Sequence, residues 1–216
     1  MNILFLGKPG SGKGSISQRL INDSCIQLST GDLLRKEENT NSDLGREIAI
    51  QLAGGNFATD QQIASLVTAF LNENVDKSII FDGYPRNLNQ AKSCFDSGIF
   101  FDRVFLIDVP DDKIQDRIIN RRVHVPSGRV YNTLTLPPKV DGIDDITGEP
   151  LTHRKDDRLE VIEQRLENYR NLTFPIIEYL KEKEIEVIVI DGTMPLSEQV
   201  SLVNSHLPST SKKFKM

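Results

Sequence analysis

The alternation of apolar runs with helical periodicity is the clearest pattern in this chain. Continuous apolar runs, typical of strands inside a parallel sheet, occupy residues 2–6, 78–81, 103–108 and 186–190, with a weaker one at 25–28. Helical patterns lie between and after them, over residues 13–22, 60–73, 87–95, 111–121 and 156–182. This alternation implies right-handed crossovers, so we predict a doubly wound parallel sheet of about five strands with helices on both faces.

Two stretches interrupt this alternation. Residues 30–59 hold two polar helical pieces between the second and third predicted strands. Residues 122–155 are rich in proline and glycine, and the alternating pattern of 129–136 suggests hairpins. A stretch of this length without a helix inside a compact domain is usually a lid or a binding loop.

Charge and cysteine content narrow the functional classes. The chain has 216 residues, which suits one substantial core, and its net charge of −5 argues against a nucleic-acid or anionic-membrane binder. Its two cysteines, Cys25 and Cys94, are too few for a disulfide framework. No apolar run reaches the length of a membrane span, and the first residues do not resemble a signal peptide. We therefore expect a cytoplasmic protein with no membrane or nucleic-acid partner.

A glycine-rich loop follows the first predicted strand. Residues 7–15 read GKPGSGKGS and lead from that strand into a helix. In such a loop the backbone N–H groups turn toward phosphate oxygens, the helix adds its positive dipole end, and Lys13 reaches the terminal phosphates. The usual motif has Ser or Thr directly after the lysine, whereas here Gly14 precedes Ser15. The loop predicts binding of a nucleoside triphosphate but no particular reaction.

An aspartate and an arginine stand where the third predicted strand ends. Asp82 follows the run at 78–81, and a carboxylate there can hold water-ligated Mg²⁺ beside the phosphates. Its alternative role is to cap the helix that starts near Asn87. Arg86 projects from the same edge, and its planar guanidinium can bind phosphate oxygens in pairs.

Four more arginines extend this cluster. Arg117 and Arg121 are four residues apart, which places them on one face of the predicted helix. Arg154 and Arg165 are eleven apart and share a face if their helix starts early enough. Each arginine alone suits a solvated surface, but a group of them near strand ends and a lid predicts a site for two polyphosphates.

Four stretches of the sequence resemble the adenylate kinases, in their bacterial form with a long lid. They are GKPGSGKGS at 7–15, STGDLLR at 29–35, FDGYPRNLNQA at 81–91, and RRVHVPSGRVY at 121–131 together with TGEPLTHRKDD at 147–157. The resemblance implies an α/β fold with a three-layer P-loop kinase core over 1–206. It also implies a helical AMP-binding insertion at 30–59, a β-rich lid at 120–157 and a flexible tail at 207–216.

The resemblance also implies roles for individual residues. Those expected to bind ATP are Gly10, Ser11, Gly12, Lys13, Gly14, Ser15, Arg117, Arg121, Val130, Tyr131 and Met194. Those expected to bind AMP are Thr30, Arg35, Asn56, Phe57, Ala58, Gly83, Tyr84, Pro85, Arg86, Gln90, Arg154 and Arg165. The expected catalytic residues are Lys13, Asp82, Arg86, Arg121, Arg154 and Arg165. In this scheme Gln90 reads the adenine edge, and Asp82 holds Mg²⁺ through water, with no direct protein ligand to the metal.

Some positions depart from the family pattern. Lys8 lies inside the phosphate loop, where a small residue is commoner, and we expect it to face solvent. Residues 56–58 read Asn-Phe-Ala where relatives often have Lys-Leu-Val, so a charge near the AMP pocket is missing. Met194 stands where a lysine is frequent. If this position contacts the ATP base through its backbone, the change of side chain matters little.

The lid raises the question of zinc. Some relatives bind structural zinc there, and the four corresponding positions here are His124, Ser127, Asp144 and Thr147. This set contains no thiolate and makes a poor zinc site. We therefore expect no structural zinc and a hydrogen-bonded cluster that pins the two halves of the lid.

The predicted activity is that of an adenylate kinase, the reversible Mg²⁺-dependent transfer of the ATP γ-phosphoryl group to AMP, giving two ADP. The partners would be ATP and AMP or ADP, and we expect a monomer. A kinase for CMP, UMP or several monophosphates is the alternative, which the long insertion at 122–155 and the pair Thr30 and Gln90 disfavour. A GTPase-type switch should carry Asn-Lys-x-Asp, and no Asn-Lys dipeptide occurs. A degenerate, non-enzymatic binder is disfavoured because the charged residues of the site are in place.

Overall fold

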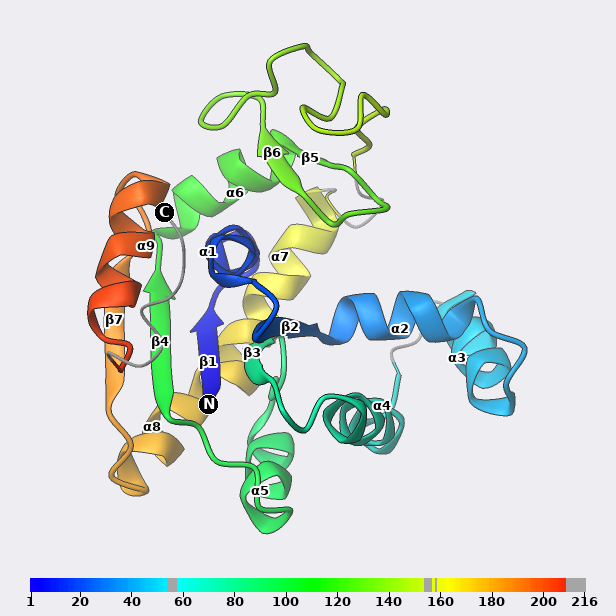
Figure 1. Cartoon of the computed structure of the whole chain (residues 1–216), viewed down its shortest axis with the longest axis vertical. Helices are drawn as coiled ribbons and strands as arrows, with labels where there is room; N and C mark the ends of the chain where they lie inside the picture. Colours follow the sequence, from blue (N-terminus) through cyan, green and yellow to red (C-terminus); the bar gives the residue numbers. More distant parts are fainter. Residues whose placement is uncertain (54–57, 154–156, 158, 209–216) are drawn as a thin grey trace.

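The computed structural model describes residues 1–53, 58–153, 157 and 159–208. At its centre lies a five-stranded parallel sheet with the order β2-β3-β1-β4-β7 (Figure 1). Its strands are β1 (Asn2–Gly7), β2 (Cys25–Ser29), β3 (Ser78–Asp82), β4 (Arg103–Asp108) and β7 (Val187–Asp191). The predicted doubly wound sheet is confirmed, and the weakest of the predicted strands is its edge strand β2.

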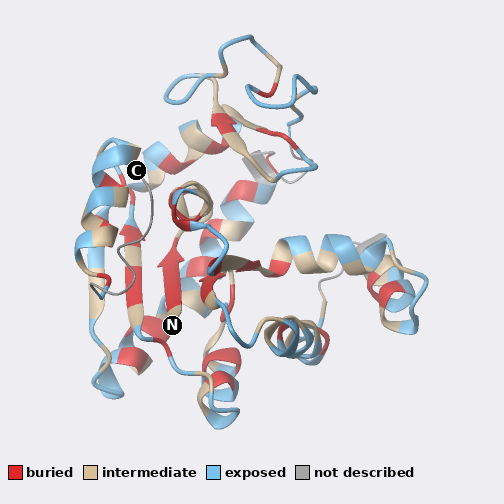
Figure 2. Ribbon diagram, viewed as in Figure 1, coloured by how far each residue is buried: buried red, intermediate tan, exposed pale blue. Residues whose placement is uncertain are grey.

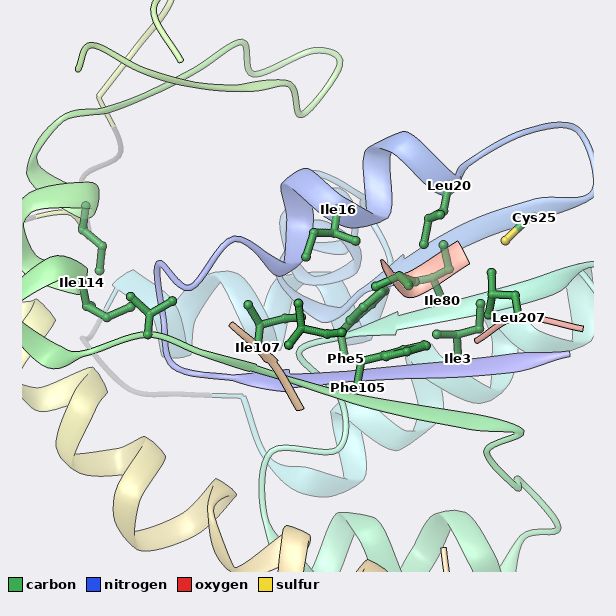
Figure 3. Close-up of a cluster of buried hydrophobic side chains, with 14 of the residues drawn as sticks. Ile3, Phe5, Ile16, Leu20, Cys25, Ile80, Phe105, Ile107, Ile114 and Leu207 are labelled. Atoms are coloured by element: carbon green, nitrogen blue, oxygen red, sulfur yellow. The ribbon is translucent and has the colours of Figure 1, made fainter. Parts of the chain in front are cut away.

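The continuous apolar run of β1 is explained by burial on both faces of the sheet. Ile3 and Phe5 pack into one apolar layer, between the sheet and helix α1 (Lys13–Leu20) (Figure 3). Leu4 and Leu6 belong to the layer on the opposite face. These four side chains are at most 2% exposed, and Figure 2 shows the central strands as the most buried part of the fold. Because side chains alternate across a strand, only an unbroken apolar run serves both layers.

Helices from distant parts of the chain form the two outer layers. The layer that covers Ile3 and Phe5 contains α1, α6 (Asp111–Ile119) and α9 (Leu196–Ser205), and α7 (Leu159–Asn168) adds Ile162 and Leu166 to the same buried cluster. The other contains α4 (Asp60–Glu73), α5 (Leu88–Asp96) and α8 (Pro175–Glu182). The arrangement is therefore the three-layer α/β fold that the sequence predicts.

The single helix predicted over 156–182 is wrong in one respect. The structure instead has α7, a π-helical turn η1 (Tyr169–Thr173) and then α8. The N–H of Phe174 donates to the carbonyl of Tyr169, five residues back, at 2.8 Å. Pro175 opens α8, and because proline has no N–H to donate, the α-helical ladder is interrupted there.

Two insertions leave the core at different places. The first contains α2 (Thr30–Glu38) and α3 (Asp43–Ala53), which project sideways from the carboxyl end of β2 (Figure 1). Thr59 then begins α4 with a reciprocal capping box to Gln62, which fixes the start of that helix. The second insertion, the segment predicted as a lid and called the lid below, rises between α6 and α7 on the antiparallel pair β5 (Arg121–Val123) and β6 (Val130–Asn132).

The helix predicted over 111–121 is too long, because the chain leaves the helix at the base of the lid. Helix α6 ends at Ile119, and Arg121 instead opens β5, opposite Asn132. Asn120 terminates the helix, and its carbonyl accepts the Thr133 N–H at 2.9 Å, a bond across the lid rather than along the helix. Within the described residues, helices that are long and apolar enough to cross a membrane do not occur.

Candidate functional site

The glycine-rich loop joins β1 to α1 at the carboxyl end of the central strand. Gly7 and Gly10 have φ values of +145° and +79°, which side chains rarely adopt. A Cβ at Gly7 would also lie 2.5 Å from the carbonyl oxygen of Ile107, and one at Gly10 would lie 2.6 Å from Ile118. The loop can therefore curl this tightly only with glycine at both positions, and it sets the start of α1 beside the strand ends.

Lys13 lies folded into this loop. Its ammonium donates to the carbonyl oxygens of Gly7 at 2.7 Å and Lys8 at 2.8 Å. Burial lowers the pKa of Lys13 to about 8; the Asp82 carboxylate opposes this shift, whereas nearby arginines add to it. Those arginines are Arg86, Arg165 and Arg121. Groups from β5, α7 and the loop after β3 thus place positive charge in the neighbourhood of one ammonium.

Asp82 stands at the end of β3 against the start of α1. Its Oδ2 accepts a hydrogen bond from Gln27 Nε2 at 2.8 Å, and a Cβ on Gly14 would lie 3.4 Å from the same oxygen. The alternative role as a helix cap is not seen, because α5 is capped by Asn87, whose Oδ1 accepts the N–H of Gln90 at 2.8 Å. The carboxylate is therefore placed at the phosphate loop and not at a helix start.

Two cations brace the phosphate loop from outside. Arg117 donates to the carbonyls of Ser11 at 3.2 Å and Gly192 at 2.7 Å, and burial lowers its pKa. The expectation that Lys8 faces solvent is wrong: its ammonium donates to the Val109 carbonyl at 2.8 Å and pairs with Asp111 at 2.8 Å. Both side chains tie the loop to the segments that follow β4 and β7.

Arg121 and Arg165 meet at a shared carboxylate. Arg121 pairs through two nitrogens with Asp157, whose side chain is fully buried, and Arg165 Nη1 lies 3.9 Å from the same carboxylate. The prediction that Arg117 and Arg121 share a helix face is wrong, since Arg121 is in β5. Helix α7 begins at Leu159, and Arg154 lies outside the described residues.

A second group of predicted residues gathers where β3 ends and α2 begins. Thr30 is buried and donates from Oγ1 to the Gly83 carbonyl at 3.0 Å. Arg86 Nε donates to the same carbonyl at 2.7 Å, and a Cβ on Gly83 would lie 3.0 Å from Arg86 Nη2. Tyr84 is buried beside them, in a Tyr84–Pro85 cis peptide. The DGYPR stretch and the start of α2 thus form one wall.

Gln90 lies near the start of α5, and Arg35 lies on α2. Gln90 is 4% exposed, and its Oε1 accepts the backbone N–H of Arg86 at 2.7 Å. Arg35 pairs with Asp32 on α2 and is half exposed. Ala58 is described and partly buried, whereas Asn56 and Phe57 lie outside the described residues.

In the lid, one hydrogen-bonded group contains the four residues that the sequence analysis singled out, His124, Ser127, Asp144 and Thr147. His124 is buried, with its ring nitrogens 2.6 Å from Ser127 Oγ and 2.6 Å from Glu149 Oε2. Asp144 accepts the N–H and hydroxyl of Thr147 at 2.8 Å and 3.0 Å. Thr147 Oγ1 lies 3.3 Å from His124 Nε2, which joins the two halves of the lid.

Asp144 is the centre of this group. Arg129 donates to both of its oxygens, at 2.8 Å and 2.7 Å, and the Tyr131 hydroxyl donates at 3.0 Å. The hydrogen bonds from Arg129 hold the pKa of Asp144 far below its usual value. Because the unfolded carboxyl titrates near 3.9, this contribution to lid stability is complete above about pH 4 and is lost only as the pH falls toward the lowered value.

Replacing Asp144 should loosen the lid specifically. In Asp144→Ala the Arg129 guanidinium and the Tyr131 hydroxyl lose a buried acceptor, so protease cleavage within 120–157 should accelerate about tenfold. Asp145→Ala is the matched control, because Asp145 is exposed and its carboxylate accepts a hydrogen bond only from the Lys139 N–H among the described contacts. Equal cleavage rates in the two variants would contradict the central role of Asp144.

The remaining predicted ATP residues lie near the lid and the last strand. The Tyr131 hydroxyl is engaged with Asp144 and the N–H of Asp145, so this side chain is packed inside the lid, with Val130 before it in β6. Met194 follows β7, and its carbonyl accepts Gln199 Nε2 at 2.7 Å. Gln18 of α1 donates to the Gly128 carbonyl at 2.6 Å, which connects the lid to the phosphate-loop helix.

Sequence reasoning missed several carboxylates and amides that organise the site. Asp157 pairs with two arginines, Gln27 holds Asp82, and Glu149 and Arg129 complete the lid group. For Asp157 there was a signal, since two consecutive acids end the stretch RKDD that follows the lid. For Gln27 there was none, because its partner is 55 residues away and is reached only through β2–β3 pairing.

The family model that matches this chain and two of its relatives carry the same description. A sequence model of the family described as "Adenylate kinase" matches residues 5–185. Proteins with the same description from Sodalis glossinidius and Photorhabdus laumondii subsp. laumondii are each 40% identical over 204 residues. Each alignment covers 92% of this chain and 95% of the relative.

Proposed function

This chain belongs to the adenylate kinase family, which transfers a phosphoryl group reversibly between ATP and AMP to give two ADP, and we propose that the site above carries that reaction. One observation carries the proposal. Lys13 sits in the phosphate loop, and Arg86, Arg121 and Arg165 lie near enough to it for their charges to lower its pKa. Such a concentration of positive charge beside strand ends suits two nucleotides that meet through their phosphates.

The ATP side of the site is assigned to the phosphate loop and the lid. We place the ATP phosphates at the N–H groups of 10–15, at Lys13 and at Arg121. Arg117 supports the loop through the Ser11 carbonyl, and this contact keeps its guanidinium next to the phosphates. Val130, Tyr131 and Met194 are assigned to the ATP base. For Tyr131 the backbone is the available contact, since its side chain is packed inside the lid.

The AMP side is assigned to the wall formed by α2 and the DGYPR stretch. Thr30, Gly83, Arg86 and Gln90 lie within that wall. We propose that Arg86 binds the AMP phosphate and Gln90 the adenine edge. The remaining residues assigned to AMP are Arg35, Asn56, Phe57, Ala58, Tyr84, Pro85, Arg154 and Arg165.

The family uses Mg²⁺ with ATP, and the donor set fits that ion. Asp82 offers a carboxylate beside Gly14, and oxygen is the ligand that Mg²⁺ prefers. We propose that Asp82 orients the ion through water, while Ser15 contributes its hydroxyl one turn into α1. When bound, the ion neutralises charge on the phosphate oxygens.

The reaction needs positioning and charge neutralisation rather than a side-chain nucleophile. An oxygen of the AMP phosphate attacks the γ-phosphorus in line, and the bond from that phosphorus to the ADP oxygen breaks. Lys13, Arg86 and Arg121 neutralise charge on the phosphates as it shifts, and such groups act most strongly where water is excluded. We propose that the lid and the α2–α3 segment close over the nucleotides to exclude water.

A comparison of acceptor nucleotides tests this function. In a coupled assay that offers AMP, CMP, UMP and GMP separately with ATP, we expect AMP to be preferred by about 100-fold or more, because hydrogen-bond readout rejects mismatched bases. Faster phosphorylation of CMP or UMP than of AMP would refute the assignment of adenine.

We further propose that the protein acts as a cytoplasmic monomer. Cys25 and Cys94 are both free and buried, which is compatible with a reducing compartment. Sedimentation of the purified protein near the 24.3 kDa of one chain is the expected result.

A further inference from the structure

The side-chain amide of Gln90 is held by two partners of opposite hydrogen-bonding character. Its Nε2 donates to Asp60 Oδ1 at 2.6 Å, and its Oε1 accepts the backbone N–H of Arg86 at 2.7 Å. A carboxylate can only accept, and a backbone N–H can only donate. Rotating this amide by 180° would set oxygen against carboxylate and N–H against N–H. The two partners therefore define one orientation of the amide.

Asp60 is itself fixed in place. It is the first residue of α4 and lies between Thr59 and Gln62, the two residues of the capping box. Both of its oxygens lie 3.1 Å from Asn87 Nδ2, and Asn87 caps the helix that carries Gln90. The carboxylate thus connects the starts of α4 and α5, and its position relative to Gln90 is set by two helix ends.

Each Gln90 amide atom retains hydrogen-bonding capacity beyond these contacts. An amide nitrogen carries two hydrogens and an amide oxygen two lone pairs. One N–H donor and one acceptor site therefore remain for a base. Asp60 and the Arg86 N–H fix which side of the amide carries the donor and which side carries the acceptor.

We propose that Asp60 is a positioning residue that makes the acceptor site selective for a 6-amino purine over a 6-oxo purine. The 6-amino group of adenine donates and its N1 accepts, whereas in hypoxanthine the 6-oxygen accepts and N1–H donates. The fixed amide matches adenine. It can match hypoxanthine only after a flip that Asp60 and Arg86 both oppose. This inference rests on the proposed function, in which Gln90 reads the base.

The test compares AMP with IMP, which differs from it only at these two base positions. Asp60→Asn is nearly isosteric, and the introduced amide can turn its NH₂ group toward Gln90, which removes one of the two contacts that oppose the flipped orientation. We expect the ratio of kcat/KM for AMP over IMP to fall about tenfold or more, with IMP turnover rising and AMP turnover falling. General structural damage would lower both turnovers and leave the ratio unchanged, and that outcome would overturn the proposal.

Three further variants complete the design. Asp60→Ala, which removes the carboxylate at an exposed helix start, should change the ratio in the same direction even if the asparagine variant is poorly folded. Asp43→Asn is the matched control, because it removes a first-turn carboxylate from α3 that pairs with Arg46; the ratio should not change. In Gln90→Ala the ratio should collapse. An unchanged ratio there would refute base reading by Gln90, whereas a collapse there with parental ratios in both Asp60 variants would refute only the role of Asp60.

Discussion

Replacing Lys13 with methionine should lower kcat/KM for ATP by about 10³-fold, or about 4 kcal/mol of transition-state stabilisation. The Lys13 ammonium is held by two carbonyls of the phosphate loop and lies within the electrostatic influence of three arginines, and methionine keeps most of its length without the charge. Steady-state kinetics with ATP varied at saturating AMP measure the effect. Lys77→Met is the matched control, since Lys77 is exposed and its ammonium donates only to the Asp23 carbonyl among the described contacts. Comparable losses in both variants would contradict a specific role for Lys13.

The same lysine gives a pH signature. Because burial lowers the pKa of Lys13 to about 8, the free enzyme loses this charge as the pH rises through that value. We expect kcat/KM for ATP to fall with it, and the methionine variant to lack this limb. The lowered pKa of Lys13 also makes the free energy of unfolding depend on pH. An unfolded lysine titrates near 10.4, so between about pH 8 and 10 the unfolded chain binds more protons, and the free energy of unfolding rises with pH.

The core of the fold could be predicted from sequence because its causes are local. The run at 103–108 is apolar on both sides, and only a strand covered on both faces uses such a run. Gly7 and Gly10 indicate a tight loop, because no side chain fits at either position. The end of α6 could not be predicted in this way. Neither glycine nor proline marks Asn120, and the helix stops there because the lid pairs with the next residues.

The same distinction between local and long-range causes applies to the residues of the site. The residues assigned to phosphate follow strand ends and motifs that are contiguous in sequence, so Lys13, Asp82 and Arg86 could be chosen from patterns alone. Their supports come from elsewhere in the chain. Asp157 meets Arg121 from 36 residues away, and Asp60 meets Gln90 from 30. Periodicity carries no information about such pairs, because they exist only once helices and strands are packed.

Truncation of Arg86 should separate catalysis from stability. Arg86→Ala should lower kcat by about 10³- to 10⁵-fold, roughly 4–7 kcal/mol, because a positioned guanidinium neutralises the phosphoryl group in transfer. The fold should tolerate the change. Its backbone N–H donates to Gln90 and its carbonyl accepts Thr173 Oγ1 at 2.7 Å, and alanine keeps both contacts. The free energy of unfolding should therefore change by less than about 1 kcal/mol, which urea titration measures.

Arg103→Ala supplies the matched comparison for that experiment. Arg103 also donates to backbone carbonyls, those of His206 at 2.8 Å and Asp102 at 2.6 Å, but it opens β4 at the opposite end of the strand from the phosphate loop. Its loss should cost stability of a similar size and leave turnover near the parental value. If Arg86→Ala also kept near-normal turnover, its guanidinium would be a structural support of the Gly83 carbonyl and not a ligand of the transferred group.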